Sequence, residues 1–167
     1  FFLSICNSRC ENMLTDKDYK WMAWCMEGAK IFSTCEKKQY MAIIVDKNGI
    51  IESTGYNGSP SGFPHCFETC PRFINRVPSG TPYDFGEGLC YSIHSEINCL
   101  IHSDQSKRVG GTMYLNGVPC FGCAKTIANS GLARLVYLEE PFERIGNDEA
   151  FGLLLQSKVS IEGLVFP

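Results

Sequence analysis

The chain has 167 residues, 44% of them hydrophobic, which is enough for one domain with its own core and too short for two. Its formal net charge is −3, and its 15 Lys and Arg residues are scattered along the sequence. Because binding to a nucleic-acid backbone relies on clustered cations, this distribution argues against DNA or RNA as a partner. No apolar run approaches the roughly 18 residues of a membrane span, so no membrane partner is expected.

The first methionine is Met13, and the apolar start of the chain lacks the basic segment and cleavage site of a secretory signal. We expect residues 1–12 to be a leader or disordered, and residues 13–167 to form the single domain. The chain also has ten cysteines. Without a secretion signal, these favour metal ligands in a reducing compartment over disulfides, which predicts a cytoplasmic location, or the host cytoplasm for a viral protein.

Helical and strand patterns alternate along the chain. Residues 16–33 have apolar side chains at helical spacing after a Thr-Asp cap, and residues 40–56 predict a β-hairpin that turns at Asn48-Gly49. Residues 57–90 are rich in Gly, Pro and Cys, and they predict a long irregular loop that requires a staple or a functional reason. The remaining predicted elements are a helix from about 94, a strand over 112–116, a helix over 120–130, a strand over 134–138, a helix near 147–157 and a strand over 159–165. This order predicts an α/β fold with a mixed sheet of about five strands flanked by helices.

His94 and Glu96 lie two residues apart at the start of a predicted helix, and Cys120 and Cys123 form a CxxC motif at the start of another. A helix N-terminus favours thiolates. One His and two Cys are one donor short of a closed zinc tetrahedron, and catalytic zinc sites keep the fourth position for water. Zinc lowers the pKa of that water from 15.7 to about 7, and a carboxylate that is not a ligand can then transfer protons. H-x-E followed by P-C-x-x-C is the signature of zinc deaminases.

From about Lys30 to Tyr137, the chain resembles the deoxycytidylate (dCMP) deaminase family, with a pattern nearest to phage and bacterial members. The resemblance is carried by four segments, STGYNGSPSG (53–62), IHSEINCL (93–100), GGTMYL (110–115) and PCFGCAKTIANSG (119–131). It implies the cytidine-deaminase fold and the zinc-dependent hydrolysis of dCMP to dUMP with release of ammonia.

The resemblance also implies roles for individual residues. His94, Cys120 and Cys123 would bind the catalytic Zn²⁺, and Glu96 would pass protons to N3 of the base and then to the leaving amine. Asn57 would hydrogen-bond the sugar, and Ser95 would contact the base through its backbone. Further implications are a homohexamer, dCTP and dTTP as effectors, and an effector loop that contains Gly55, Tyr56 and Gly58.

A second, structural Zn²⁺ is implied as well. Its ligands would be Cys35, Cys66, Cys70 and Cys90, with His65 as a substitute for one of them. Four thiolates leave no open position, so this site would staple the long loop instead of catalysing a reaction. The alternative is that the four cysteines are free thiols, a common state for buried Cys.

Some positions depart from the family pattern. Tyr40-Met41 replaces the usual Val-Gly, Asn116-Gly117 stands where a hydroxyl residue is more common, Ser95 replaces Ala, and Phe142 replaces a Tyr. The alternatives are therefore a deaminase of another free base, nucleoside or nucleotide, including a purine, an enzyme that edits polynucleotides, or a zinc-stapled binding module without catalysis. The cation for the substrate phosphate is left open among Arg72, Arg76, Lys107, Arg108, Lys125 and Arg144, most of which we expect to be solvated.

Overall fold

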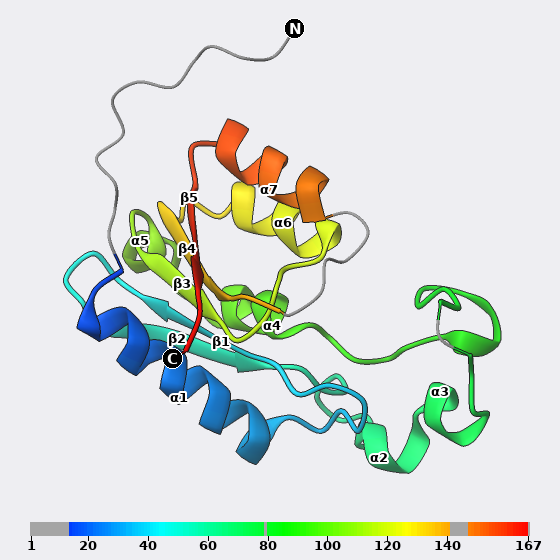
Figure 1. Ribbon diagram of the computed structural model, residues 1–167. Helices are drawn as coiled ribbons and strands as arrows, with labels where there is room; N and C mark the ends of the chain where they lie inside the picture. The colour runs from blue at the N-terminus through cyan, green and yellow to red at the C-terminus, as the bar shows by residue number, and fades with distance from the viewer. Residues whose placement is uncertain (1–13, 79, 141–146, 167) are drawn as a thin grey trace, which may run out of the picture.

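The computed structural model describes residues 14–78, 80–140 and 147–166, so the predictions for residues 1–12, Phe142 and Arg144 lie outside the described residues. The chain forms an α/β unit in which helices cover both faces of a sheet (Figure 1). Within the described residues, no helix has the length and apolar character needed to cross a membrane.

The sheet has five strands and is mixed, as predicted. β1 is antiparallel to β2 and β3, and the remaining neighbours are parallel. The predicted hairpin joins β1 to β2, and its turn is closed by Asp46 Oδ1, which accepts from the Asn48 and Ile50 amides. In order across the sheet, the strands are β2 (Ile51–Tyr56), β1 (Met41–Val45), β3 (Thr112–Leu115), β4 (Arg134–Leu138) and β5 (Ser160–Leu164).

The core lies on both sides of this sheet. Helix α1 (Asp16–Phe32) covers one face, and α4 (Ser95–Ile101), α6 (Phe121–Ala128) and α7 (Asn147–Gln156) cover the other (Figure 1). Because side chains alternate along a strand, each strand contributes to both layers. From β1, Met41, Ile43 and Val45 pack toward α1, and Ala42 and Ile44 pack toward the other helices.

Four helical turns were not predicted from the sequence: α2 (Cys66–Thr69), α3 (Pro71–Ile74), the 3₁₀ turn η1 (Gly86–Gly88) and α5 (Gln105–Arg108). The prediction of an irregular loop over 57–90 is corrected accordingly, since three of these turns lie in it. A one-turn helix is too short for a hydrophobic period and forms from local signals. Pro71 occupies the first turn of α3, and Asp104 caps α5 by accepting from the Ser106 amide at 2.7 Å.

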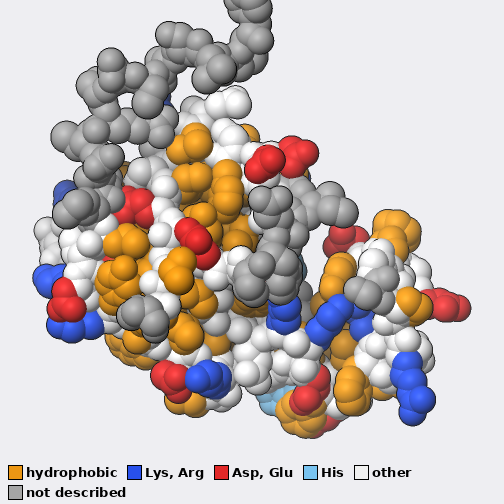
Figure 2. Space-filling view, in the orientation of Figure 1, with side chains coloured by type: hydrophobic (Ala, Val, Ile, Leu, Met, Phe, Trp, Pro, Cys, Tyr) orange, Lys and Arg blue, Asp and Glu red, His pale blue; other side chains and the backbone are white. Residues whose placement is uncertain are grey.

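Residues 59–90, which we call the lobe, project from the sheet (Figure 1). Neither core cluster includes a described residue of the lobe. The lobe is organised instead around buried Arg72, whose guanidinium donates to the carbonyls of Thr81, Pro82 and Gly88. In Figure 2 the lobe stands at the right with hydrophobic side chains exposed on it. The large exposed ones are Phe63, Phe67, Phe73, Ile74, Tyr83 and Phe85.

Candidate metal centre

The three predicted zinc donors come together at the N-termini of α4 and α6. His94 is the N-cap of α4, Cys120 is the N-cap of α6, and Cys123 lies in the first turn of α6. His94 Nδ1 is 3.6 Å from the sulfur of Cys120 and 3.3 Å from that of Cys123. The donor atoms all lie within 4.8 Å of one another.

This spacing fits tetrahedral zinc. With Zn–S near 2.3 Å and Zn–N near 2.0 Å, two ligands of a tetrahedron should be about 3.5 Å apart for sulfur and nitrogen, and about 3.8 Å for two sulfurs. The distances from His94 Nδ1 to the two sulfurs bracket the first value. One imidazole and two thiols are donors that zinc prefers, and they leave one position open. The residues present therefore fit a catalytic zinc ion.

The thiols of Cys120 and Cys123 have shifted pKa values of opposite direction. The hydrogen bond from Cys123 and the nearby His94 lower the pKa of Cys120 to about 3. The same hydrogen bond, burial and the Glu96 carboxyl raise the pKa of Cys123. The contact with Cys120 also raises the pKa of His94. Because zinc binds thiolates and neutral imidazole, metal binding at this site releases protons.

Glu96 lies in the first turn of α4 and is buried. Its Oε2 accepts a hydrogen bond from Ser95 Oγ at 3.0 Å. Burial raises the pKa of Glu96 above its usual range, although the His94 imidazole opposes that shift. A buried carboxyl beside the donors is suited to hold a proton and pass it on. The fully buried Ser95 orients this carboxyl, and its predicted backbone contact with the base stays a prediction.

Asn57 lies directly after β2 and is buried, and most of its amide group is already bonded within the protein. Its Oδ1 accepts from the Tyr40 amide at 2.8 Å and from Ser33 Oγ at 2.5 Å, and its Nδ2 donates to the Lys38 carbonyl at 2.8 Å. One amide hydrogen of Asn57 has no partner among these bonds. The contact of Asn57 with the sugar stays a prediction. Its bonds to the backbone of Tyr40 and Lys38 give it a structural role that the sequence did not suggest.

The end of β2 holds α4 in place. A Cβ at Gly55 would lie 2.2 Å from the Cys99 backbone nitrogen, so the close packing of α4 on β2 requires glycine there. Asn98 Nδ2 donates to the Tyr56 carbonyl at 2.8 Å, and Gly58 pairs through its backbone with Ile93. Gly55, Tyr56 and Gly58 thus have a structural role, and their role as an effector loop stays a prediction. Asn98 lies in the segment IHSEINCL, and nothing in that segment signals its contact with β2.

Two departures from the family pattern pack against glycines. A Cβ at Gly117 would lie 2.4 Å from the Tyr40 ring, so the ring covers the loop that leads to Cys120. The Tyr40 hydroxyl reaches Glu140 after β4 and donates to its Oε1 at 2.9 Å. Met41 packs in the same way on Gly28 of α1. At both positions, the glycine opposite the larger side chain leaves the space that this side chain fills.

The four cysteines proposed for a second zinc are less tightly grouped. Among the described residues, one set of three metal donors has ligand atoms that all lie within 4.8 Å of one another, and this set is His94, Cys120 and Cys123. Burial raises the pKa of Cys90, and the thiols of Cys35, Cys70 and Cys66 raise it further, so these three thiols lie within electrostatic reach of Cys90. His65 stacks on Phe67, with ring centroids 5.5 Å apart.

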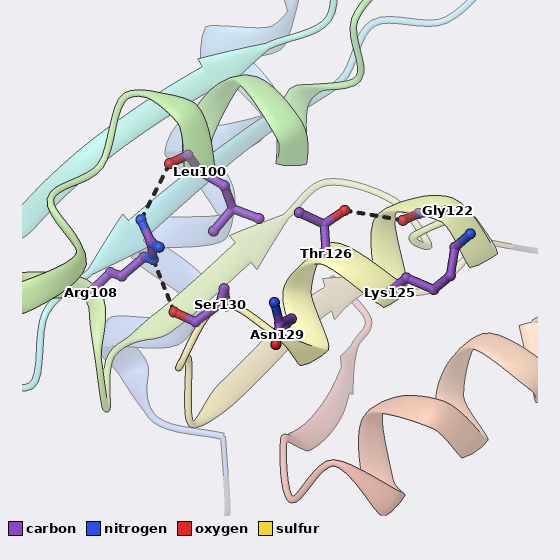
Figure 3. Close-up of a pocket in the computed structure, with 7 residues that line it drawn as sticks. All are labelled: Leu100, Arg108, Gly122, Lys125, Thr126, Asn129 and Ser130. Atoms are coloured by element: carbon purple, nitrogen blue, oxygen red, sulfur yellow. Dashed lines mark hydrogen bonds between the residues drawn. The ribbon is translucent and has the colours of Figure 1, made fainter.

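Most of the candidate phosphate-binding cations are already engaged. Arg72 is the buried hub of the lobe, and Lys107 lies 3.7 Å from Glu52. Arg108 lines a shallow depression of about 580 Å³ beside α6, where it donates to the carbonyls of Leu100 and Ser130 (Figure 3). Lys125 projects from α6 at the opposite side of this depression (Figure 3), 5.7 Å from the centre of the Phe121 ring. The zinc donors do not line the depression.

Comparison with known proteins agrees with this geometry. Residues 15–139 match the family described as the cytidine and deoxycytidylate deaminase zinc-binding region. The chain is 38% identical to the deoxycytidylate deaminase of Mycobacterium phage D29 over 65% of its own length and 84% of that protein. It is 32% identical to the deoxycytidylate deaminase of Enterobacteria phage T2 over 58% of its own length and 66% of that protein.

Its fold is similar to that of the dCMP deaminase of cyanophage S-TIM5, solved in complex with dCMP and dUMP. The TM-score is 0.68 and the sequence identity is 25%, and the match covers 92% of this chain and 100% of the other. The family match spans most of the chain and includes both zinc-donor motifs. The chain therefore belongs to the family of cytidine and deoxycytidylate deaminases.

Proposed function

We propose that this protein catalyses the hydrolysis of dCMP to dUMP and ammonia. The observation that carries the proposal is the convergence of His94, Cys120 and Cys123 within 4.8 Å, next to the buried carboxyl of Glu96. The relatives that name an activity support dCMP as the substrate, since the phage D29 and T2 proteins are deoxycytidylate deaminases. The similar S-TIM5 structure contains both dCMP and dUMP.

In this proposal His94, Cys120 and Cys123 would hold zinc, which would supply a water molecule activated for attack at neutral pH. Glu96 takes one proton from this water and delivers it to N3 of the cytosine, and it then passes the second proton of the water to the departing amine. Oxygen from water is added at C4 and the C4–N bond breaks, so dCMP and water yield dUMP and ammonia. Ser95 holds the Glu96 carboxyl in position, and Asn57 turns its remaining amide hydrogen to the sugar.

A panel of substrates tests this proposal. Ammonia release is measured with dCMP, CMP, deoxycytidine, cytosine, and the adenine and guanine nucleosides and nucleotides. We expect kcat/KM to be highest for dCMP. The value for deoxycytidine should be at least about 10-fold lower, because a charge-assisted hydrogen bond from the protein to the phosphate typically contributes more than about 1.4 kcal/mol to binding. A higher kcat/KM for any purine or for a free base contradicts the proposal.

Deamination of another base was suggested by Asn116, which departs from the family pattern. The Asn116 amide is bonded to the backbone at and before the start of β1, as the Met41 amide donates to Oδ1 at 2.7 Å and Nδ2 donates to the Gln39 carbonyl at 3.1 Å. These bonds use the oxygen and one of the two amide hydrogens of Asn116, so the departure at this position has a structural role in the fold.

The second zinc is part of the proposal as a structural site. Its support is that Cys35, Cys66 and Cys70 all lie within electrostatic reach of Cys90, together with the shortage of apolar core in the lobe. Zinc thiolate sites of this kind suit a reducing compartment, which is consistent with action in the cytoplasm. Metal analysis of the purified protein should give about two zinc ions per chain.

Homohexamer formation and regulation by dCTP and dTTP are the last parts of the proposal. The exposed aromatic side chains of the lobe support self-association, because large exposed apolar patches typically mark contact surfaces. Light scattering gives the oligomeric state. Saturation curves measured with and without each triphosphate test the regulation, and identical curves contradict it.

A further inference from the structure

An asparagine side chain fastens the end of β3 to the residues at the start of β1. The last backbone pair between these strands is Ala42 with Leu115. Beyond it, Asn116 Oδ1 accepts from the Met41 amide at 2.7 Å and Asn116 Nδ2 donates to the Gln39 carbonyl at 3.1 Å. The Asn116 backbone amide still donates to the Met41 carbonyl at 3.4 Å, and the side chain adds one acceptor and one donor to that bond.

Asn57 does the same on the other side of β1. The last pair between β1 and β2 is Met41 with Tyr56. Beyond it, Asn57 Oδ1 accepts from the Tyr40 amide and Asn57 Nδ2 donates to the Lys38 carbonyl, both at 2.8 Å. The segment 38–41 is therefore held between two amide side chains, one from each neighbouring strand.

The two amides lie where the sheet opens toward the zinc donors. After β2, Gly58 leaves the sheet and pairs with Ile93, which directly precedes His94. After β3, the chain leaves the sheet and reaches Cys120 four residues after Asn116. At this end the backbone bonding dwindles to one bond on each side, from the Asn57 amide to the Tyr40 carbonyl at 3.1 Å and from the Asn116 amide to the Met41 carbonyl at 3.4 Å, because both neighbours of β1 turn away to the metal centre. The asparagine side chains reinforce these last bonds.

We propose that Asn116 is a positioning residue of the zinc centre, an inference that rests on the proposed zinc site. The loop from Gly117 to Pro119 is short and buried, and the Tyr40 ring packs on Gly117, so the loop transmits the position of its first residue to Cys120. By fixing the start of the loop to β1, the Asn116 amide fixes the two thiols against His94. Asn116 acts through these donors and does not contact the metal.

Replacement of Asn116 by Ala should weaken zinc binding about 10-fold, the lower end of the effect seen when groups that support metal ligands are removed. At saturating zinc, kcat should fall more than KM rises, because Asn116 is not expected to contact the nucleotide. Asn116→Asp keeps the size of the side chain and the acceptor for Met41, and it replaces the donor to Gln39 by a charged oxygen that repels the Gln39 carbonyl. Its zinc affinity should therefore also fall below that of the wild type.

The matched control is Ser130→Ala. Ser130 lies beyond the C-terminus of α6, where its Oγ donates to the Ile127 carbonyl at 2.7 Å and accepts from the Leu132 amide at 3.3 Å. This variant also removes two bonds between a side chain and the backbone, at the end of α6 away from the donors. It should lower stability without weakening zinc binding.

Zinc affinity is measured for the full chain by competition with a chromophoric chelator, and the phase that is lost in His94→Ala identifies the catalytic site. Zinc affinity should be equal in the wild type and Ser130→Ala, and lower in both Asn116 variants. Wild-type affinity and kcat in Asn116→Ala overturn the inference, as does an equal loss of affinity in Ser130→Ala. If Asn116→Ala does not fold, wild-type affinity in Asn116→Asp overturns it. A wild-type protein without the catalytic phase contradicts the proposed function itself.

Discussion

Two regions of this molecule present cysteines, and they differ in how the fold supports them. The catalytic donors are attached to the first turns of α4 and α6, two helices that pack on the sheet. The lobe has short helices and no described residue in either core cluster, and its thiols are less tightly grouped than the catalytic donors. We infer that the catalytic site is largely formed before metal binds, whereas the lobe requires bonds to a central ion or side chain to become ordered.

The largest expected effect comes from a substitution at the catalytic centre that should leave the metal bound. Glu96→Gln keeps the shape of the side chain and removes its ability to transfer protons. We expect kcat for dCMP to fall by about 10² to 10⁴, with zinc content unchanged because Glu96 is not a donor. Ammonia release and metal analysis measure the two quantities. The control is Glu27→Gln on the exposed face of α1, where Glu27 pairs with Lys30 at 2.7 Å. Loss of zinc in Glu96→Gln would show that the centre is not held by its three donors alone.

The next effect separates the two regions directly. Cys70→Ser should reduce the zinc content from about two ions to one per chain and make the lobe sensitive to proteases, because the remaining ion stays with His94, Cys120 and Cys123. Activity should fall by about 10-fold, through loss of support for the entry to α4. Cys25→Ser is the control, since Cys25 is buried between α1 and the sheet and donates to the Tyr114 carbonyl at 3.5 Å. A zinc content near one in both the wild type and Cys70→Ser defeats the second site.

A smaller effect is expected from the side chain at the centre of the lobe. Arg72→Gln removes charged hydrogen bonds to the carbonyls of Thr81, Pro82 and Gly88, and the stacking of the guanidinium 3.9 Å from the centre of the Tyr83 ring. We expect the free energy of opening the lobe to fall by about 2 kcal/mol, a typical net value for bonds to a charged group.

Limited proteolysis and amide hydrogen exchange measure the opening of the lobe. Exchange in β1, β3 and β4 should be unchanged, because the hydrogen bonds and ring stacking of Arg72 lie within the lobe. Arg76→Gln is the control on an exposed arginine of the same lobe. If exchange rises equally in the strands and in the lobe, the two regions do not open separately.

The same contrast explains which features the sequence could predict. The strands, α1, α4, α6 and α7 have repeating apolar positions that face the two core layers, and their approximate bounds were predicted. The donors His94, Cys120 and Cys123 were predicted because they lie in local motifs whose chemistry requires those residue types. The lobe turns lack such repeats, so residues 57–90 were described only as an irregular loop.

Asn116 and Arg72 show what local patterns leave out. In the sequence, Asn116 is only a departure from the family pattern, because its partners Met41 and Gln39 lie 75 and 77 residues away. Arg72 was one of several candidate phosphate cations, most of which were expected at the surface. Its burial depends on three carbonyls that converge only when the lobe has folded. Pairings of side chains with a distant backbone have no sequence signature of their own.

The smallest expected effect on activity is a change that weakens the sheet body and leaves both proposed zinc sites intact. Asp18, at the start of α1, accepts hydrogen bonds from Thr15, Tyr114 and Arg134. Burial alone would raise the pKa of Asp18, but these bonds, with Arg134 the strongest, outweigh it and hold the pKa well below its usual range. Asp18→Asn should reduce the free energy of unfolding at pH 7 by about 2 kcal/mol and leave zinc content and KM unchanged.

The pH dependence gives this last prediction its sign. A carboxyl whose pKa is lower in the folded protein contributes its full stability above the unfolded-state value near pH 3.9, and that stability is lost as the pH falls from there toward the folded-state pKa. The difference in unfolding free energy between the wild type and Asp18→Asn should therefore be constant from pH 7 to about pH 5 and shrink below about pH 4. Urea unfolding with a chelator present throughout excludes a contribution from zinc release. Asp16→Asn, which alters only the exposed pair with Lys20, is the control and should not change with pH in this way. A difference that stays constant down to pH 3 would mean that the Asp18 charge does not stabilise the body.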